Sequence, residues 1–246
     1  MAIKYALNYS INFDLRKRRS KEIRFVIFHY TGMKNENDAI NRLKNFNHKV
    51  STHFFIKYNG KIICMVPEKY IAWHAGKSKW KNFSFLNKSS IGIEISNQGH
   101  SLRYSKFTNE QIKSIIKLSI YLKDKYKIKK SCFLGHSDIA PDRKVDPGEN
   151  FPWEALSKKN IGIWTNLSKK KLSALRSKKL NKRDLNLFNK KLNKLGYMKS
   201  SSLIKKISIY QKKIYKVFQM RFRPELIDGK IDQECFLILK KLVNLR

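Results

Sequence analysis

Residues 25–32 read Phe25-Val26-Ile27-Phe28-His29-Tyr30-Thr31-Gly32, an apolar run that gives way to polar residues and a glycine. A short apolar run bounded in this way predicts a buried β-strand followed by a loop. His29 then lies at the end of that strand, where a polar side chain is costly unless it is hydrogen-bonded or bound. The segment therefore predicts a central strand that carries a histidine to a site at its end.

Further strands and helices are expected around this one. Residues 50–58 and 61–66 are rich in β-branched and aromatic residues, and Asn59-Gly60 between them predicts a hairpin. Residues 91–96 alternate between isoleucine and small or polar residues, which predicts a strand with two different faces. The remaining expected elements are a strand over 132–136, a helix over 36–47 and a helix that opens at the capping box Thr108–Gln111.

The chain divides into two parts by composition. Strands mixed with a few helices predict an α/β (α+β) domain over residues 1–165, with a mixed central β-sheet flanked by helices. Residues 157–183 are basic and rich in serine and lysine, and we place a linker at 166–182. Residues 183–246 predict a small all-α, three-helix domain. Its apolar stripes are Leu185, Phe188, Leu192 and Leu195, then Tyr210, Ile214, Val217 and Phe218, then Phe236, Leu239, Leu242 and Val243, with a turn at Asp228-Gly229 and a cap at Asp232.

The charge of the chain is strongly positive. The 246 residues include 54 Lys and Arg against 18 Asp and Glu, a formal net charge of +36. Such a balance indicates anionic partners such as nucleic acid, anionic lipid or an acidic polymer. Of the basic residues 42 are Lys and 12 are Arg, spread along the whole chain, which favours compositional drift over selected contacts. No segment is long and apolar enough for a membrane span, and no export signal is visible.

Two histidines at strand ends and a loop rich in carboxylates suggest a metal site. His29 and His136 each follow an apolar run, and Asp138, Asp142 and Asp146 lie close behind His136. Two histidines and one of these carboxylates can form a three-ligand zinc site with an open fourth position, as a catalytic zinc requires. The spacing alone leaves the choice of carboxylate open.

Two charged residues near these candidate metal ligands could take part in catalysis. Lys144 stands two residues before Asp146, so in extended chain both side chains point the same way, and a lysine there can stabilise an oxyanion. The alternative is a surface ion pair of little energetic weight. Glu94 lies opposite the isoleucine face of its strand, between the small residues Gly92 and Ser96. A carboxylate near zinc can take a proton from water, although mid-strand carboxylates are more often exposed.

Several motifs resemble one known family, the zinc-dependent N-acetylmuramoyl-L-alanine amidases, and within it the two-domain, AmiD-type members. They are FVIFHYTG (25–32), VSTHFFI (50–56), AWHAGKSKW (72–80), SIGIEISN (90–97) and GHSDIAPDRKVDPGENFPW (135–153). The resemblance covers residues 1–165 and implies the zinc amidase fold and cleavage of the muramyl–L-alanine amide of peptidoglycan. It implies one zinc ion held by His29, His136 and Asp146, with Glu94 and Lys144 as catalytic residues and His53 and His74 as candidate substrate contacts.

The C-terminal part resembles a three-helix peptidoglycan-binding domain, most clearly in FQMRFRPELIDGKID (218–232). Residues 169–246 hold 23 basic and 5 acidic residues, which suits an anionic wall polymer. The expected partners are peptidoglycan or muropeptides, with no nucleic acid and no transmembrane segment, and the chain is expected to be a monomer. The compartment stays open, because relatives of this type are usually exported.

Two other functions are alternatives to the amidase. A non-catalytic peptidoglycan-binding protein would fit the resemblance but not the complete set of three ligand positions. A basic nucleic-acid-binding protein would fit the charge, but it predicts basic clusters interleaved with aromatic residues. The lysines of this chain are spread too evenly for that pattern.

Overall fold

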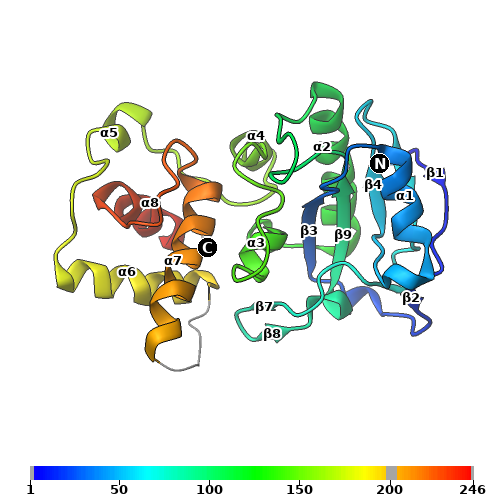
Figure 1. The fold of residues 1–246 in the computed structure, drawn as a ribbon, viewed down its shortest axis with the longest axis horizontal. Helices are drawn as coiled ribbons and strands as arrows, with labels where there is room; N and C mark the ends of the chain where they lie inside the picture. Colours follow the sequence, from blue (N-terminus) through cyan, green and yellow to red (C-terminus); the bar gives the residue numbers. More distant parts are fainter. Residues whose placement is uncertain (1–2, 198–203, 245–246) are drawn as a thin grey trace.

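The computed structural model describes residues 3–197 and 204–244. A β-sheet with helices on both faces forms one side of the molecule, and the C-terminal helices form the other side (Figure 1). The central sheet has six strands in the order β1-β5-β4-β9-β3-β10. They span Ala6–Leu7 (β1), Ile62–Cys64 (β5), Phe54–Ile56 (β4), Ser90–Ile95 (β9), Phe25–Tyr30 (β3) and Phe133–Gly135 (β10).

The sheet is mixed, as the sequence predicts. Strands β4, β9, β3 and β10 run parallel, and only the β4–β5 hairpin is antiparallel. The hairpin turns at Gly60, whose positive φ of 78° suits glycine. Two small antiparallel pairs lie outside this sheet: β2 (Phe13–Asp14) with β6 (Ile71–Ala72), and β7 (Lys79–Trp80) with β8 (Phe83–Ser84).

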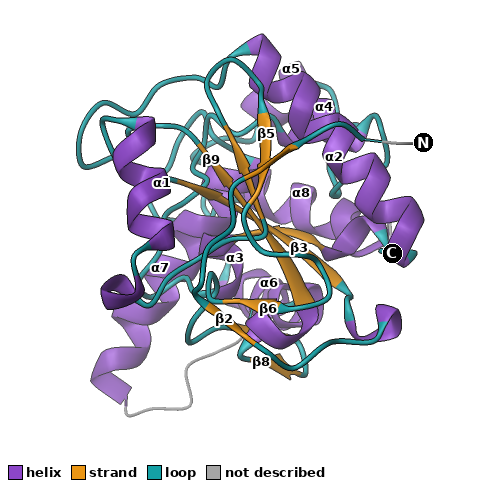
Figure 2. Cartoon of the chain, turned by 90° about the vertical axis from the view of Figure 1, so that its right-hand side faces the viewer, coloured by secondary structure: helices purple, strands orange, loops and turns teal. Residues whose placement is uncertain are grey.

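The two helices predicted within residues 1–165 are present. Helix α1 spans Glu36–Lys44, somewhat shorter than the predicted range, and α2 spans Asn109–Tyr126. The capping box that opens α2 is confirmed, because the Thr108 hydroxyl accepts from the backbone N–H of Gln111 while the Gln111 side chain accepts from Thr108 N–H. Figure 2 shows the strands at the centre with α1 and α2 on opposite sides of them.

One boundary prediction is wrong. The strand predicted over 132–136 ends at Gly135, and His136 instead begins a short helix, α3 (His136–Ile139). The chain then loops to α4 (Trp153–Ser157). His136 still lies directly behind the end of β10, so the error moves the element boundary and leaves the histidine near the sheet edge.

The C-terminal residues are helical, with α6 at Lys182–Leu195, α7 at Ile204–Phe222 and α8 at Gln233–Asn244. The Asp232 carboxylate caps α8 by accepting from the N–H of Cys235 at 2.9 Å. A further short helix, α5 (Lys169–Ser173), lies inside the stretch predicted as a linker, and its Leu172 is buried in a core with the later helices. We call α5 to α8, with Tyr197 that follows α6, the helical region.

The two faces of the sheet have different coverings. Val26 and Phe28 point into a core formed with Ile115, Leu118 and Leu122 of α2. The opposite face carries His29 and Glu94, which are register partners on β3 and β9. We call it the site face. On this face α1 packs over β4 and β5, with Leu43 near Phe55, while the helical region packs over β3 and β10. A gap for a site is left between these two coverings.

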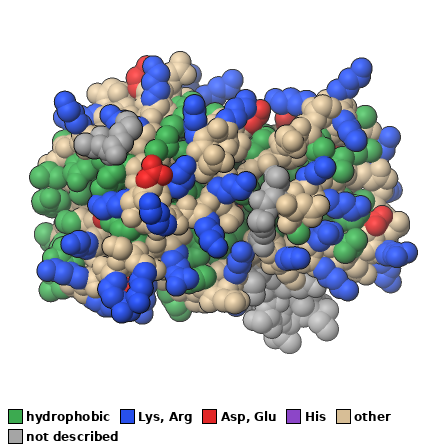
Figure 3. All heavy atoms as spheres, turned by 180° about the vertical axis from the view of Figure 1, so that it is seen from behind, with side chains coloured by type: hydrophobic (Ala, Val, Ile, Leu, Met, Phe, Trp, Pro, Cys, Tyr) green, Lys and Arg blue, Asp and Glu red, His purple; other side chains and the backbone are tan. Residues whose placement is uncertain are grey.

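The basic residues do not gather on one part of the surface. Figure 3 shows lysines and arginines scattered among apolar and polar atoms over the whole of the face that it presents. Among the described residues, no helix combines the length and the apolar character needed to cross a bilayer.

The site face of β9 tolerates no added side chain at Gly92. A Cβ built there would lie 2.5 Å from Cγ of His74. We expect Gly92→Ala to lower the free energy of unfolding by about 1–3 kcal/mol, because the packed ring must shift. Urea unfolding measures the change. Ser96→Ala on the same chain segment is the control, since its buried hydroxyl has no hydrogen-bond partner and its removal should be neutral or stabilising. An unaltered stability in Gly92→Ala would contradict the packing.

Candidate active site

A cavity of about 430 Å³ opens at the carboxyl ends of β3 and β9 on the site face. Parallel strands end at the same sheet edge, which is why residues far apart in the sequence meet there. Helix α1 forms one wall of the cavity, and α3 and the loop after it contribute the residues opposite. It is lined by His29, Tyr30, Thr31, Gly32, Met33, Ala39, Arg42, Leu43, Val50, Ser51, Trp73, His74, Glu94, His136, Lys144 and Asp146.

Three buried side chains converge on one point of this cavity. Nδ1 of His29 lies 2.9 Å from Nδ1 of His136, and Oδ2 of Asp146 lies 3.2 Å and 3.0 Å from these two nitrogens. Their exposures are 2%, 3% and 6%. Three lone-pair donors held this close, away from water, repel one another unless a cation or a proton lies between them. Among the described residues this is the one His/Cys/Asp/Glu group of metal-site geometry, and it is the group predicted from the sequence.

The hydrogen bond of His136 fixes which nitrogen faces that point. Its Nε2 lies 3.2 Å from the carbonyl oxygen of Ala75, which can only accept, so Nε2 carries the proton. Nδ1 then presents a lone pair toward His29 and Asp146. A histidine that binds a metal is commonly held in this way by a hydrogen bond at its other nitrogen.

His29 is set in the same way through a longer chain. Ser90 donates its hydroxyl to the Leu86 carbonyl at 2.6 Å, so its oxygen accepts from Nε2–H of His74 at 3.1 Å. Nδ1 of His74 is then an acceptor, and it receives Nε2–H of His29 at 3.0 Å. Nδ1 of His29 is therefore left as a lone pair at the convergence point.

These hydrogen bonds place His74 behind His29, at the ring nitrogen that faces away from the convergence point. Predicted as a candidate substrate contact, His74 does line the cavity, but both of its ring nitrogens are engaged by Ser90 and His29. The geometry supports a role in orienting His29.

The structure places His53, the other candidate substrate contact, outside the cavity. Its side chain is 0% exposed and does not line the cavity. Its Nδ1 accepts from the backbone N–H of Gly92 at 3.0 Å, and its Nε2 lies 2.8 Å from Nη2 of Arg18 and 3.1 Å from the Tyr70 carbonyl oxygen. His53 therefore supports the backbone of β9 at Gly92 in this structure. The sequence motif predicts a histidine in this segment, but it does not show whether other elements of the fold will bury the side chain.

The two predicted catalytic side chains lie in the cavity beside the convergence point. Glu94 is the register partner of His29 on the adjacent strand, and Lys144 reaches the cavity from the loop after α3. Burial raises the pKa of Glu94 to about 8, and the negative charge of Asp146 adds to this rise while Lys144 opposes it. A carboxyl group with such a pKa can both accept and donate a proton near neutral pH.

Burial also sets the charge states of the converging residues. It lowers the pKa of His29 to about 4, with repulsion from His136 adding to the effect and Asp146 opposing it. Burial by itself disfavours the ionised form of Asp146, but contacts with His136 and His29 outweigh it and hold the pKa of that carboxyl well below its usual range. At neutral pH the point is therefore lined by a neutral His29 and a carboxylate, which are the forms that bind a metal.

Other cavity residues received no role from the sequence. Tyr30 and Trp73 stand inside two of the family-like motifs, and their position beside His29 and His74 was the available signal. Arg42 comes from α1, where a single arginine in a polar helix gives no signal. His48 and His100 are both exposed and lie outside the cavity, and His100 also contacts Tyr30 and Glu149.

Comparison with known sequences identifies relatives of this chain. The family model of N-acetylmuramoyl-L-alanine amidase matches residues 19–149. The amidase AmiD of Escherichia coli is 32% identical over 235 residues, which cover 90% of this chain and 83% of AmiD. The 1,6-anhydro-N-acetylmuramyl-L-alanine amidase AmpD of Haemophilus influenzae is 38% identical over 107 residues, 43% of this chain and 56% of its own length.

Solved structures agree with the sequence comparison over nearly the whole chain. AmiD of E. coli, in complex with the substrate anhydro-N-acetylmuramic acid-L-Ala-D-gamma-Glu-L-Lys, superposes with a TM-score of 0.78 at 30% identity, covering 91% of this chain and 90% of AmiD. AmpDh3 of Pseudomonas aeruginosa, in complex with an anhydromuramic pentapeptide, has a TM-score of 0.78 at 27% identity, covering 96% of this chain and 98% of AmpDh3. The fold class is thus confirmed, and the chain belongs to the N-acetylmuramoyl-L-alanine amidase family of peptidoglycan hydrolases.

Proposed function

We propose that this amidase uses a single zinc ion, held by His29, His136 and Asp146, to hydrolyse the amide between the muramyl lactyl group and L-alanine. The observation that carries the proposal is the convergence of two imidazole nitrogens and one carboxylate oxygen, 2.9–3.2 Å apart, on one point of the cavity. Because structures of AmiD and AmpDh3 hold anhydromuramyl peptides, we propose these as the first substrates to test.

The donor set fits zinc. Tetrahedral zinc with bonds of about 2.0–2.1 Å to nitrogen and oxygen separates its ligand atoms by roughly 3.3 Å, close to the spacing found. Three protein ligands leave one position open to the cavity. When bound, zinc supplies a Lewis acid that makes water a better nucleophile at neutral pH and polarises a carbonyl group.

Glu94 is the group we assign to proton transfer. The attacking water must lose a proton as its oxygen bonds to the amide carbon, and the alanine nitrogen must gain one before the C–N bond breaks. One carboxyl group can do both in turn when its pKa lies near the working pH, and the burial of Glu94 raises its pKa to about 8. Its place on β9, directly across from His29, puts it at the side of the reacting atoms.

Lys144 is the group we assign to the oxyanion. As water adds, the amide carbonyl oxygen gains negative charge, and an ammonium group in a partly buried site stabilises that charge more than it would in water. Lys144 and Asp146 both line the cavity, and the chain between them is short enough to hold the lysine beside the metal position. Arg42 and Trp73, on the cavity wall near α1, are proposed to bind the acidic peptide and the sugar.

For the C-terminal residues we propose peptidoglycan binding, and we keep the division into a catalytic domain over 1–165, a linker over 166–182 and a helical domain over 183–246. The three-helix pattern and the excess of 23 basic over 5 acidic residues in 169–246 support attachment to an anionic polymer.

The function is tested by incubating the protein with purified anhydromuramyl peptides and detecting the free stem peptide by mass spectrometry. We expect release in the presence of zinc and none after treatment with a chelator, with activity restored by added zinc. His29→Ala should bind zinc at least a hundredfold more weakly and release no peptide. Release that persists in His29→Ala, or that ignores the chelator, would contradict the metal assignment.

Replacing the two catalytic candidates should separate chemistry from metal binding. We expect Glu94→Gln to lower kcat by about 10²–10⁴-fold and Lys144→Met by about 10²–10³-fold, with zinc still bound. Glu149→Gln is the control for the carboxylate, because Glu149 is half-buried outside this cavity. Steady-state kinetics with metal analysis measures both properties. A Glu94→Gln variant as active as the control would remove Glu94 from the mechanism.

The metal-free protein should lose stability on mild acidification. Burial holds the pKa of His53 and of His74 well below the usual value, and that of His29 near 4, so all three stay neutral when folded. Unfolding frees them to protonate below about pH 6.5, so each histidine lowers stability by roughly 1 kcal/mol between pH 6.5 and 5.5. Glu94, whose pKa burial raises to about 8, acts in the opposite direction and offsets about one histidine, so the net stability still falls as pH falls. Urea unfolding with chelator at both pH values measures this, and His53→Gln should flatten the dependence. Equal stability at the two pH values would refute it.

A further inference from the structure

The turn that carries His136 is held from outside the catalytic part of the chain. Asp138, in α3 with His136, is 2% exposed. Its Oδ1 accepts from the hydroxyl of Tyr197 and its Oδ2 accepts from Nη1 of Arg221, both in the helical region. Oδ2 also accepts the backbone N–H of Gly135, the residue before His136, at 2.8 Å.

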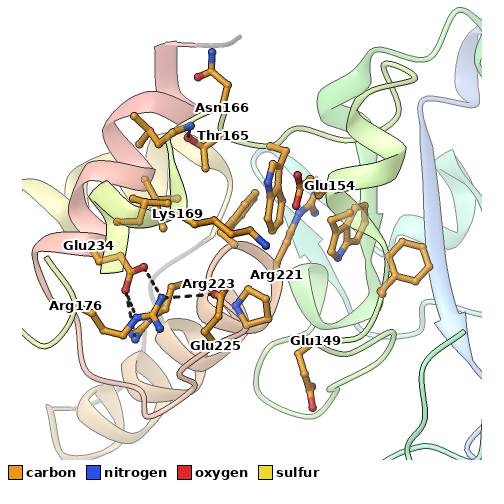
Figure 4. A pocket seen from close by; sticks show the side chains of 18 of the residues that line it. Glu149, Glu154, Thr165, Asn166, Lys169, Arg176, Arg221, Arg223, Glu225 and Glu234 are labelled. Carbon is orange, nitrogen blue, oxygen red and sulfur yellow. Dashed lines mark hydrogen bonds and ion pairs between the residues drawn. The ribbon is translucent and has the colours of Figure 1, made fainter. Parts of the chain in front are cut away.

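The contacts of Asp138 with Tyr197 and Arg221 are shielded from solvent. Tyr197 is 1% exposed and Arg221 4%. Burial raises the pKa of Tyr197 well above its usual value, so the phenol keeps the proton that it donates. The Arg221 guanidinium lies 3.8 Å from the ring centroid of Trp153 and also donates to the Phe133 carbonyl of β10 at 3.1 Å. A second cavity, separate from the active site, lies between the helical region and the rest of the chain (Figure 4). Arg221 lies on its α4 side, across from the Arg176–Glu234 pair.

The helical region is seated closely where Tyr197 enters. Gly196 has a φ of 135°, and a Cβ there would lie 2.4 Å from the Trp80 ring of β7. Trp80 then meets the Tyr197 ring edge-on, with centroids 5.1 Å apart. Phe25, Ile27 and Leu134 of the sheet share one core with α6, α7 and α8. The position of the Tyr197 hydroxyl is thus fixed by packing against the sheet.

The Asp138 carboxylate reaches the metal site through the backbone. By bonding Gly135 N–H it fixes the entry into α3, and so the direction of the His136 ring. The next residue, Ser137, donates its N–H to the carbonyl of Asp146 at 2.8 Å. The α3 turn therefore positions two of the three converging side chains, and a loosened turn would move both.

We propose that Tyr197 and Arg221 are positioning residues of the metal centre, so that the helical region, beyond any attachment to wall polymer, holds the zinc site in binding geometry through Asp138. The proposal rests on the proposed zinc site. Outer groups that orient metal ligands commonly change metal affinity by 10–100-fold.

The test uses full-length Tyr197→Phe and Arg221→Met, which keep the packing volume and remove the polar contacts. Zinc affinity is measured by competition with a chromophoric chelator, and hydrogen exchange of residues 133–147 is measured on the metal-free protein. The control is Arg176→Met, which breaks a two-pronged ion pair with Glu234 inside the helical region and does not touch α3.

We expect Tyr197→Phe and Arg221→Met to weaken zinc binding at least tenfold and to speed exchange across 133–147, while Arg176→Met leaves both within threefold of the wild type. Folded variants with wild-type affinity and exchange would overturn the proposal. If Arg221→Met does not fold, Tyr197→Phe, which loses one oxygen atom, decides. A wild type that binds no zinc would refute the proposed function, and the exchange measurement would then still judge the contact with α3.

Discussion

The approach of three lone-pair donors to one buried point is the constraint on which the rest of the structure depends. Nδ1 of His29, Nδ1 of His136 and Oδ2 of Asp146 lie within 3.2 Å of one another. Each of the three residues is held there by a hydrogen bond at its other ring nitrogen or at its backbone. Ala75 takes Nε2–H of His136, the His74–Ser90 chain takes Nε2–H of His29, and Ser137 holds the backbone of Asp146. Much of the polar interior of the site face therefore holds these three residues in position.

The covering of the site face follows from the same requirement. A sheet face that is wholly packed has no room for a substrate, and one that is open cannot bury metal ligands. Here α1 covers β4 and β5, the helical region covers β3 and β10, and the cavity lies between them above β9. This arrangement places the helical region against the turn that carries His136. A segment whose sequence resembles a wall-binding domain therefore also contacts, through Tyr197 and Arg221, the turn that carries His136.

The sequence predicted elements and chemistry better than it predicted burial. Alternation on 91–96, the Asn59-Gly60 turn and the Thr108 capping box are local patterns, and each appears in the structure. The proposed ligand set follows from the family-like motifs, since spacing alone leaves three carboxylates open. The burial of His53 could not be predicted, because the depth of a side chain depends on which elements cover it. Arg221 and Tyr197 received no role, because their partner Asp138 lies 83 and 59 residues away in the chain.

The central claim is that zinc occupies the point at which these two nitrogens and one oxygen meet. A crystal structure of the zinc-loaded protein, with anomalous data collected at the zinc edge, tests it most directly. We expect one ion about 2.0–2.1 Å from Nδ1 of His29, Nδ1 of His136 and an oxygen of Asp146, with its fourth position toward Glu94 and Lys144. An ion bound elsewhere, or held through Nε2 of either histidine, would contradict the hydrogen-bond chains that set these rings.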